Sequence, residues 1–285
     1  MATSGIWRNR WRRDLKIIAS GLLAKNDLRM QINQVAAQLY TLRDHLKTPA
    51  DIATTLKKVA AIGYRAVQVS GMGPIDEAEL LKILNSEGLT CCATHEPGLR
   101  ILDETAQVIE RLQKLNCRYT AFPHPGAVDF RQADQIETLA KKLDAAGAAM
   151  AKAGLVLTYH NHAIEFVHYQ GRPVLEYIYA ATDPRHLQGE IDTYWIQAGG
   201  GDPVAWCQKL KGRLPLLHMK DYAYLASDKH AMAEIGSGNL NWKKIVAAAE
   251  KSGCEWFIVE QDVCPADPFD SLKKSFEYIA ANLVS

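Results

Sequence analysis

The sequence lacks a long apolar run, a strong excess of one charge, and any cysteine pair at metal-binding spacing. No apolar run approaches the roughly 18 residues of a transmembrane helix, so we expect no membrane association. The 285 residues carry 33 Lys and Arg against 32 Asp and Glu, which gives no global field that would attract nucleic acid. The six cysteines form no CxxC motif, and this predicts free thiols in a reducing, cytoplasmic compartment.

The basic segment 1–29 is the exception to this charge balance, with seven Lys and Arg against two acidic residues. Its Arg12-Arg13 pair is similar to a twin-arginine export signal, so export stays an alternative. However, the apolar patch from Leu15 to Ala24 is short, is interrupted by Lys16 and lacks a small-residue cleavage site. We interpret 1–29 as an N-terminal extension and expect the folded domain to span 30–285.

From residue 30 onward, eight apolar segments alternate with eight amphipathic ones. The apolar segments predict strands at 32–40, 66–71, 89–95, 119–124, 155–160, 187–195, 214–221 and 256–262. The amphipathic segments predict helices at 48–63, 75–88, 103–116, 132–154, 173–182, 202–212, 241–253 and 267–283. This alternation is typical of a parallel sheet with covered faces, and its length predicts a single-domain (β/α)8 TIM barrel. An open doubly wound sheet is the alternative, but no glycine-rich phosphate loop follows the first strand.

Chemically active side chains gather where the predicted strands end, which is where barrels of this kind carry their active sites. Five of the nine histidines are found there. A single strand-end His or Asp is usually structural, so the combination carries the inference. In chain order, these strand-end residues are Gln38, His95, His124, His160, His162, Asp192, His218 and Glu260.

Three acidic residues near these strand ends predict a metal ion. Glu165, Asp192 and Glu260 would bring three negative charges into one partly dry bowl, and without a cation such clustering is costly. A divalent ion removes this cost. Mostly oxygen ligands with one imidazole suit a hard ion such as Mn²⁺ or Mg²⁺.

The stretch TYHNHAIEF, at 158–166, places two histidines at the tip of the fifth strand. Side chains alternate along a strand, so His160 and His162 share a face, which we expect to be the barrel mouth. His162 lies nearer the tip, where a substrate carbon can reach it. His160 lies one step deeper, where it would contact a sugar hydroxyl or orient the metal ligands.

Taken together, residues 31–283 resemble the sugar phosphate isomerase/epimerase superfamily of xylose isomerase-like barrels. The motifs that carry the resemblance are QLYTLRD, YHNHAIEF, EIDTYW, HMKDY, EIGSGNLNW and VEQD, in order and on the appropriate strands. The resemblance implies one divalent metal, often manganese, with Co²⁺ and Zn²⁺ as further possibilities. It is held by Glu, Asp, His and Glu from strands 5 to 8, and the last three match Asp192, His218 and Glu260.

Two positions depart from the ketose epimerases of this superfamily. Tyr159 stands where they place the first strand-5 Glu, and Trp195 stands where they place a His. The HxH-then-Glu arrangement is more similar to the branch of inosose dehydratase and of enzymes that cleave C-glycosides of 3-keto sugars. That resemblance implies Glu165 as the fourth metal ligand, with a catalytic role as well, and His162 as the catalytic base.

The resemblance implies chemistry on a keto sugar or cyclitol. The metal chelates a carbonyl oxygen and a neighbouring hydroxyl and stabilises the enediolate that forms after proton removal. His162 would take the proton, and Glu260 would act as acid or base from the other side. Lys220 would hold a developing oxyanion, with a surface lysine paired to Asp221 as the alternative interpretation. The remaining expected substrate contacts are His95, His124, His160, Trp195 and Gln38.

Other functions stay open at this stage. A lyase using the same enediolate would need an acid for its leaving group, which His160 or His124 could supply. A DNA-repair nuclease of the endonuclease IV type resembles this fold, and SDKH at 227–230 is similar to its Asp-x-His pair. Against it, Trp195 replaces a required His and 30–285 is slightly acidic. A non-catalytic sugar-binding barrel is the last alternative. We expect a small, unphosphorylated sugar as the partner, no nucleic acid, and a possible homo-oligomer.

Overall fold

Eight parallel strands close into a barrel in the computed structural model, which describes residues 30–227 and 229–285. The predicted extension at 1–29 and Asp228 lie outside these ranges. Around the barrel the strand order is β1-β2-β3-β4-β5-β8-β9-β12, which confirms the (β/α)8 fold. The strands are β1 (Val35–Gln38), β2 (Ala66–Val69), β3 (Thr90–His95), β4 (Tyr119–Phe122), β5 (Val156–His160), β8 (Leu187–Asp192), β9 (Leu216–Met219) and β12 (Trp256–Val259).

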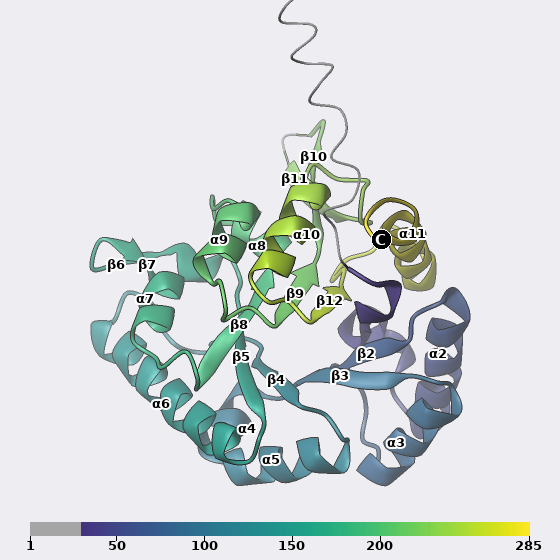
Figure 1. Ribbon diagram of the computed structural model, residues 1–285, viewed down its shortest axis with the longest axis horizontal. Helices are drawn as coiled ribbons and strands as arrows, with labels where there is room; N and C mark the ends of the chain where they lie inside the picture. The colour runs from purple at the N-terminus through teal and green to yellow at the C-terminus, as the bar shows by residue number, and fades with distance from the viewer. Residues whose placement is uncertain (1–29, 228) are drawn as a thin grey trace, which may run out of the picture.

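Helices surround the strands and cover the outside of the barrel (Figure 1). The α-helices are α2 (Pro49–Ile62), α3 (Glu77–Ser86), α4 (Gly98–Asp103), α5 (Thr105–Lys114), α6 (Ala133–Lys152), α7 (Val174–Ala180), α8 (Thr193–Ala198), α9 (Pro203–Lys209), α10 (Trp242–Lys251) and α11 (Pro268–Asn282). Short 3-10 helices are η1 (Ile32–Gln34), η2 (Leu39–His45) and η3 (Ile164–Phe166). No helix in the described part of the chain is long and apolar enough to cross a membrane.

The start of α2 illustrates how local sequence sets these elements. The Thr48 hydroxyl accepts a hydrogen bond from the backbone N–H of Asp51 at 3.2 Å, and the Asp51 carboxylate accepts one from the N–H of Thr48 at 3.0 Å. This reciprocal cap satisfies two donors that the first helical turn leaves free. Gly63 follows the helix with φ of +130°, a conformation that glycine adopts readily.

The predicted strand at 187–195 is shorter in the structure. β8 ends at Asp192, because the Asp192 carboxylate accepts a hydrogen bond from the N–H of Trp195 at 3.0 Å and so begins α8. Two unpredicted hairpins, β6–β7 (His168–Tyr169 and Arg172–Pro173) and β10–β11 (Asp221–Leu225 and Lys229–Ala233), follow β5 and β9. Both therefore extend the loops at the end of the barrel where we predicted the site.

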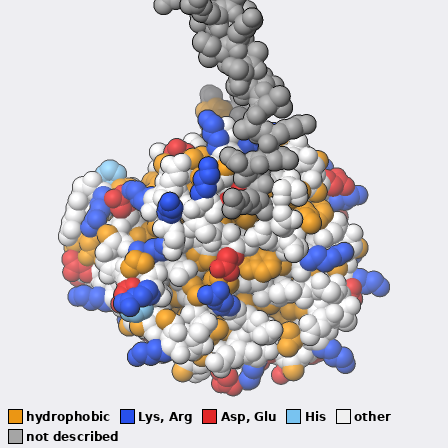
Figure 2. Space-filling model, in the orientation of Figure 1, with side chains coloured by type: hydrophobic (Ala, Val, Ile, Leu, Met, Phe, Trp, Pro, Cys, Tyr) orange, Lys and Arg blue, Asp and Glu red, His pale blue; other side chains and the backbone are white. Residues whose placement is uncertain are grey.

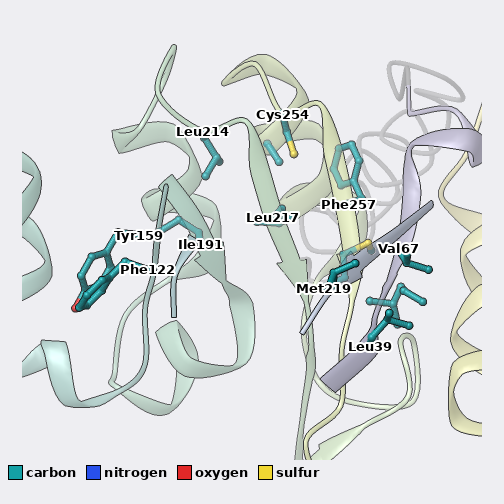
Figure 3. Packing of buried hydrophobic residues seen from close by; sticks show 14 of the residues in the cluster. Leu39, Val67, Phe122, Tyr159, Ile191, Leu214, Leu217, Met219, Cys254 and Phe257 are labelled. Carbon is teal, nitrogen blue, oxygen red and sulfur yellow. The ribbon is translucent and has the colours of Figure 1, made fainter. Parts of the chain in front are cut away.

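Apolar side chains fill the space between the barrel and its helices, as Figure 3 shows for residues such as Phe122, Tyr159 and Phe257. A smaller apolar cluster that includes Ala36 and Ile258 is also buried. Among the described residues on the face shown in Figure 2, both basic and acidic side chains lie around the rim.

Candidate metal centre

Four side chains from neighbouring strands converge at one end of the barrel. They are His160 of β5, Asp192 of β8, His218 of β9, and Glu260, which directly follows β12. All four are buried, and one donor atom from each lies within 4.8 Å of the others. The Nδ1 of His218 is 3.0 Å from Glu260 Oε2, and the Nε2 of His160 is 3.3 Å from Asp192 Oδ2. Donors that share an ion through bonds of about 2.0–2.2 Å lie about 3.0–3.5 Å apart. These two pairs have that spacing, and the group as a whole could hold one divalent ion.

Both imidazoles of this group are anchored through their far nitrogen. The Nδ1 of His160 is 3.2 Å from the carbonyl oxygen of Pro123. A carbonyl only accepts, so Nδ1 carries the proton and the Nε2 lone pair faces the group. The Nε2 of His218 likewise faces acceptors, at 2.7 Å from Gln68 Oε1 and beside the Glu190 carboxylate. This leaves the Nδ1 atom of His218 as the nitrogen that faces the converging group. Metal-bound histidines are typically anchored in this way, and the donor set therefore fits a metal ion.

Glu190 lies under the group, two residues before Asp192 on the same face of β8. Its carboxylate is fully buried and accepts from His218, from His95 Nε2 at 2.7 Å, and from Gln68 Nε2 at 3.1 Å. Burial by itself would raise the pKa of Glu190, but His218 and His95 hold it well below its usual range. Glu190 is thus a buried anion beneath the site, held in place by its hydrogen bonds.

Lys220 is fully buried within the group rather than on the surface. Its Nζ lies 2.9 Å from Asp192 Oδ2, 2.7 Å from Glu260 Oε2 and 2.8 Å from Asp262 Oδ2. Burial opposes the charge on Lys220, yet these three carboxylates raise its pKa well above the usual value. The interpretation of Lys220 as a surface lysine paired with Asp221 is therefore wrong.

Asp221 has a different role, because its carboxylate collects donors from the loop that follows β11. It accepts from the backbone N–H groups of Gly236 and Gly238 at 2.8 and 3.1 Å, and from Trp242 Nε1 at 2.8 Å. The EIGSGNLNW segment is folded around this one buried acid.

Glu165 does not join the converging group, in contrast to the prediction from the sequence. Its side chain is fully buried, but Oε1 accepts from the Tyr159 hydroxyl at 3.0 Å and Oε2 accepts from the backbone N–H of His162 at 2.8 Å. The chain turns back into η3 after β5, which directs Glu165 toward Tyr159 on the other face of the strand. His160 supplies the strand-5 donor in its place.

His162 lies at the mouth, among aromatic rings. Its ring centroid is 4.8 Å from that of His124, 4.9 Å from that of His160 and 5.3 Å from that of Trp195. The Nδ1 atom is buried without a hydrogen-bond partner among the described residues. Burial lowers the pKa of His162 to about 2, so the ring is neutral at physiological pH and keeps a free lone pair.

A cavity of about 710 Å³ opens beside the group. Of the residues predicted for the site, it is lined by His95, His124, His160, His162 and Glu260. Asp192, His218 and Lys220 lie behind this lining, and Gln38 belongs to the polar network below, where its Nε2 donates to Gln68 Oε1 at 2.7 Å. Trp195 does not line the cavity; its ring packs on His162, and its Nε1 is buried without a partner among the described residues.

Sequence reasoning missed three polar residues of the site. Glu190 and Gln68 lie beneath the converging group, and Asp262 lines the cavity beside Lys220. Alternation along β8 could have identified Glu190, since it shares a face with Asp192. Asp262 stands two residues after Glu260 and could have been found by the same rule.

The SDKH segment does not contribute to the converging group. His230 lies in the β10–β11 hairpin, where its Nδ1 is 2.7 Å from the hydroxyl of Tyr194 and its ring stacks on Tyr222. Asp228 lies outside the described residues. In the SDKH segment, which suggested a nuclease, His230 therefore packs within the hairpin.

Comparisons with known proteins identify the family and the fold of the chain. Residues 56–281 match the family described as xylose isomerase-like TIM barrel. An inosose dehydratase of Geobacillus kaustophilus is 23% identical over 263 residues, which cover 79% of this chain and 85% of that protein. A sugar phosphate isomerase/epimerase structure from Parabacteroides distasonis is 23% identical with a TM-score of 0.75, over 88% of this chain and 99% of that one. An L-ribulose 3-epimerase structure is 15% identical with a TM-score of 0.68, over 87% and 94% of the two chains.

Proposed function

Because the chain belongs to the xylose isomerase-like TIM barrel family, we propose that it is a divalent-metal-dependent isomerase or epimerase of a keto sugar or cyclitol, acting through an enediolate. One observation carries the proposal. Two anchored imidazoles and two carboxylates converge beside an unpaired, neutral histidine, His162, at the mouth of the barrel. A purely structural polar cluster has no need for a histidine nitrogen that is buried without a partner.

A bound divalent ion would supply positive charge beside the carbonyl oxygen of the sugar and its neighbouring hydroxyl. His162 then takes the proton from the adjacent carbon through its free lone pair. Glu260 lines the same cavity and is the group that can exchange a proton from the other side. Lys220 fixes the orientation of Glu260 and Asp192 through its ammonium group, and its charge favours an oxyanion nearby.

The donor set favours manganese. With His160 in place of Glu165, two nitrogens and two carboxylates converge, and this set is less suited to Mg²⁺ than the oxygen-rich set expected from the sequence. Mn²⁺ accepts both donor types, and Co²⁺ and Zn²⁺ do so as well. We propose Mn²⁺ as the resident ion.

An unphosphorylated sugar fits the cavity best. Arg100 and Arg111 both line it, but each is already paired with carboxylates. Arg111 pairs with Glu96 at 3.0 Å and with Glu77, while Arg100 pairs with Glu104 at 3.4 Å. A phosphate would have to displace these carboxylates, so we propose a substrate without one.

A lyase on the same site is the second candidate, and the tautomer of His124 favours it. Its Nδ1 accepts from the backbone N–H of Gly126 at 2.9 Å, so the neutral ring carries its proton on Nε2. A donor of this kind in the cavity suits protonation of a leaving group at the β-carbon. The curated relative named inosose dehydratase is consistent with such an elimination.

The test begins with metal analysis of the purified protein, followed by incubation with candidate keto sugars in D₂O. We expect about one divalent ion per chain and incorporation of deuterium at the carbon beside the carbonyl. A panel of 3-keto glycosides separates the two candidates, since only a lyase releases the substituent. A protein that binds no divalent ion at any pH between 6 and 9 would contradict both.

A further inference from the structure

Glu165 is a buried acid for which the proposed chemistry provides no role. It is fully buried, and it makes no ion pair with Lys or Arg within the described residues. Oε1 accepts a hydrogen bond from the Tyr159 hydroxyl at 3.0 Å, and Oε2 accepts one from the His162 backbone N–H at 2.8 Å. Burying a carboxylate is costly unless its bonds serve the fold or the function.

Tyr159, one of the two hydrogen-bond partners of Glu165, is fixed in the apolar layer between the barrel and its helices. Tyr159 has no exposed surface, and its ring stacks on Phe122 with centroids 5.6 Å apart (Figure 3). It also meets the ring of Tyr179 of α7 edge-on, at 6.5 Å. Its hydroxyl therefore holds Glu165 Oε1 at a rigid point between the barrel and its helices.

The other hydrogen-bond partner of Glu165 is the backbone that carries the proposed base. β5 ends at His160, and His162 belongs to the irregular turn before η3. Without a strand partner, the N–H of His162 bonds only to Glu165 Oε2 among the hydrogen bonds found for it. The bond therefore joins Glu165 to the turn from which the His162 side chain reaches the cavity.

We propose that Glu165 is a positioning residue that fixes His162 in the cavity by linking its backbone to Tyr159. This inference rests on the proposed role of His162 as the base. It assigns Glu165 no contact with metal or substrate. It also separates the two acids that resemblance to other barrels would treat alike, since Glu260 faces the cavity and Glu165 faces the outer layer.

The test compares Glu165→Gln with Glu165→Met. The amide can still accept from His162 and can donate to the Tyr159 hydroxyl, whereas Met fills the space without either bond. We expect Glu165→Met to lower kcat for deuterium exchange by about 10- to 100-fold, the usual cost of a misplaced catalytic group, with KM changed less than about 3-fold. Glu165→Gln should recover most of kcat. Both variants should keep the metal content of the wild type.

Glu137→Met is the matched control. Glu137 accepts from the Tyr169 hydroxyl at 2.9 Å and so forms the same kind of Tyr–Glu pair away from the cavity. The Glu137→Met variant should have the kcat of the wild type. If Glu165→Met does not fold, Tyr159→Phe removes one of the two bonds and should give a smaller fall in kcat of the same kind.

An NMR measurement separates this proposal from the proposed function. With chelator present to remove paramagnetic Mn²⁺, ring signals of His162, assigned by their loss in His162→Ala, should shift in Glu165→Met and stay in place in Glu137→Met. This readout holds even if no keto sugar is turned over. Loss of metal in Glu165→Gln, or wild-type His162 signals in Glu165→Met, would overturn the proposal.

Discussion

The ammonium nitrogen of Lys220 lies 2.7 Å from Glu260 Oε2, on the same oxygen that faces His218 Nδ1 at 3.0 Å. A divalent ion held by Glu260 and Asp192 would therefore share these carboxylates with Lys220, which also lies 2.9 Å from Asp192 Oδ2. A third carboxylate, that of Asp262, lies 2.8 Å from Nζ and lines the cavity. The lysine is thus an internal counter-ion that offsets part of the negative charge of the site.

Replacing Lys220 with Met should make the protein depend more strongly on metal. The variant leaves buried carboxylates without their cation, which destabilises the metal-free protein. Metal then restores more stability than it does in the wild type. We expect the metal-induced rise in Tm, measured by calorimetry with Mn²⁺ or with chelator, to be larger in Lys220→Met. Lys211→Met, at an exposed position, is the control, and equal rises in all three proteins would contradict this role.

Replacing the two histidines of TYHNHAIEF one at a time should have different effects on metal content and on proton exchange. His160→Ala removes a donor of the converging group and should lower both metal content and activity. His162→Ala should leave metal content near normal while slowing proton exchange at the substrate carbon by roughly 10²–10⁴, the usual contribution of a general base. Metal is measured by elemental analysis and exchange by NMR in D₂O. Full exchange in His162→Ala, or loss of metal in that variant only, would mean that the roles are reversed.

Barrel and site location could be predicted from the sequence because both follow from periodic patterns. Apolar runs that alternate with amphipathic ones identify the eight strands, and position at the strand ends brings Asp192, His218 and Glu260 together. The strand-5 donor could not be fixed in the same way. Its identity depends on the turn after His160, where the chain leaves the strand and alternation no longer applies.

Lys220 shows a second limit of sequence reasoning. Its neighbour Asp221 offered a simple ion pair, but five donors, from the backbone of Tyr222, Gly236, Gly238 and Leu240 and from Trp242 Nε1, occupy that carboxylate. Lys220 turns instead to acids that are distant in sequence. Pairing between residues brought together by barrel closure is not visible in local sequence.

Glu190→Gln should weaken metal binding without removing a ligand. The carboxylate accepts from His218 and His95 and receives Gln68 Nε2 at 3.1 Å. An amide presents N–H groups to part of this network, so the His218 ring loses its fixed acceptor. Loss of such a supporting contact typically costs 10- to 100-fold in metal affinity. Titration calorimetry with Mn²⁺ measures it, Glu110→Gln on the surface is the control, and unchanged affinity would show that Glu190 serves packing alone.

Two buried groups should give opposite pH dependences of stability. Burial raises the pKa of Glu165 to about 7, from 4.5, and lowers that of His162 to about 2, from 6.5. Between pH 4.5 and 7 the native state keeps a proton on Glu165 that the unfolded state has lost. Glu165 therefore lowers the stability of the fold as pH rises from about 4.5 to 7. The unfolded state holds the extra proton on His162, so that group costs stability as pH falls below about 6.5.

Glu165→Gln isolates the first of these effects. The amide keeps both hydrogen bonds but cannot ionise, so the variant should gain stability relative to the wild type as pH rises from 5 to 8. The gain should approach about 3 kcal/mol, from about 1.4 kcal/mol per unit of pKa difference. Urea unfolding of both proteins with chelator present, at pH 5 and pH 8, measures it. A stability difference for Glu165→Gln that is equal at the two pH values would mean that Glu165 is already ionised in the native protein at pH 5.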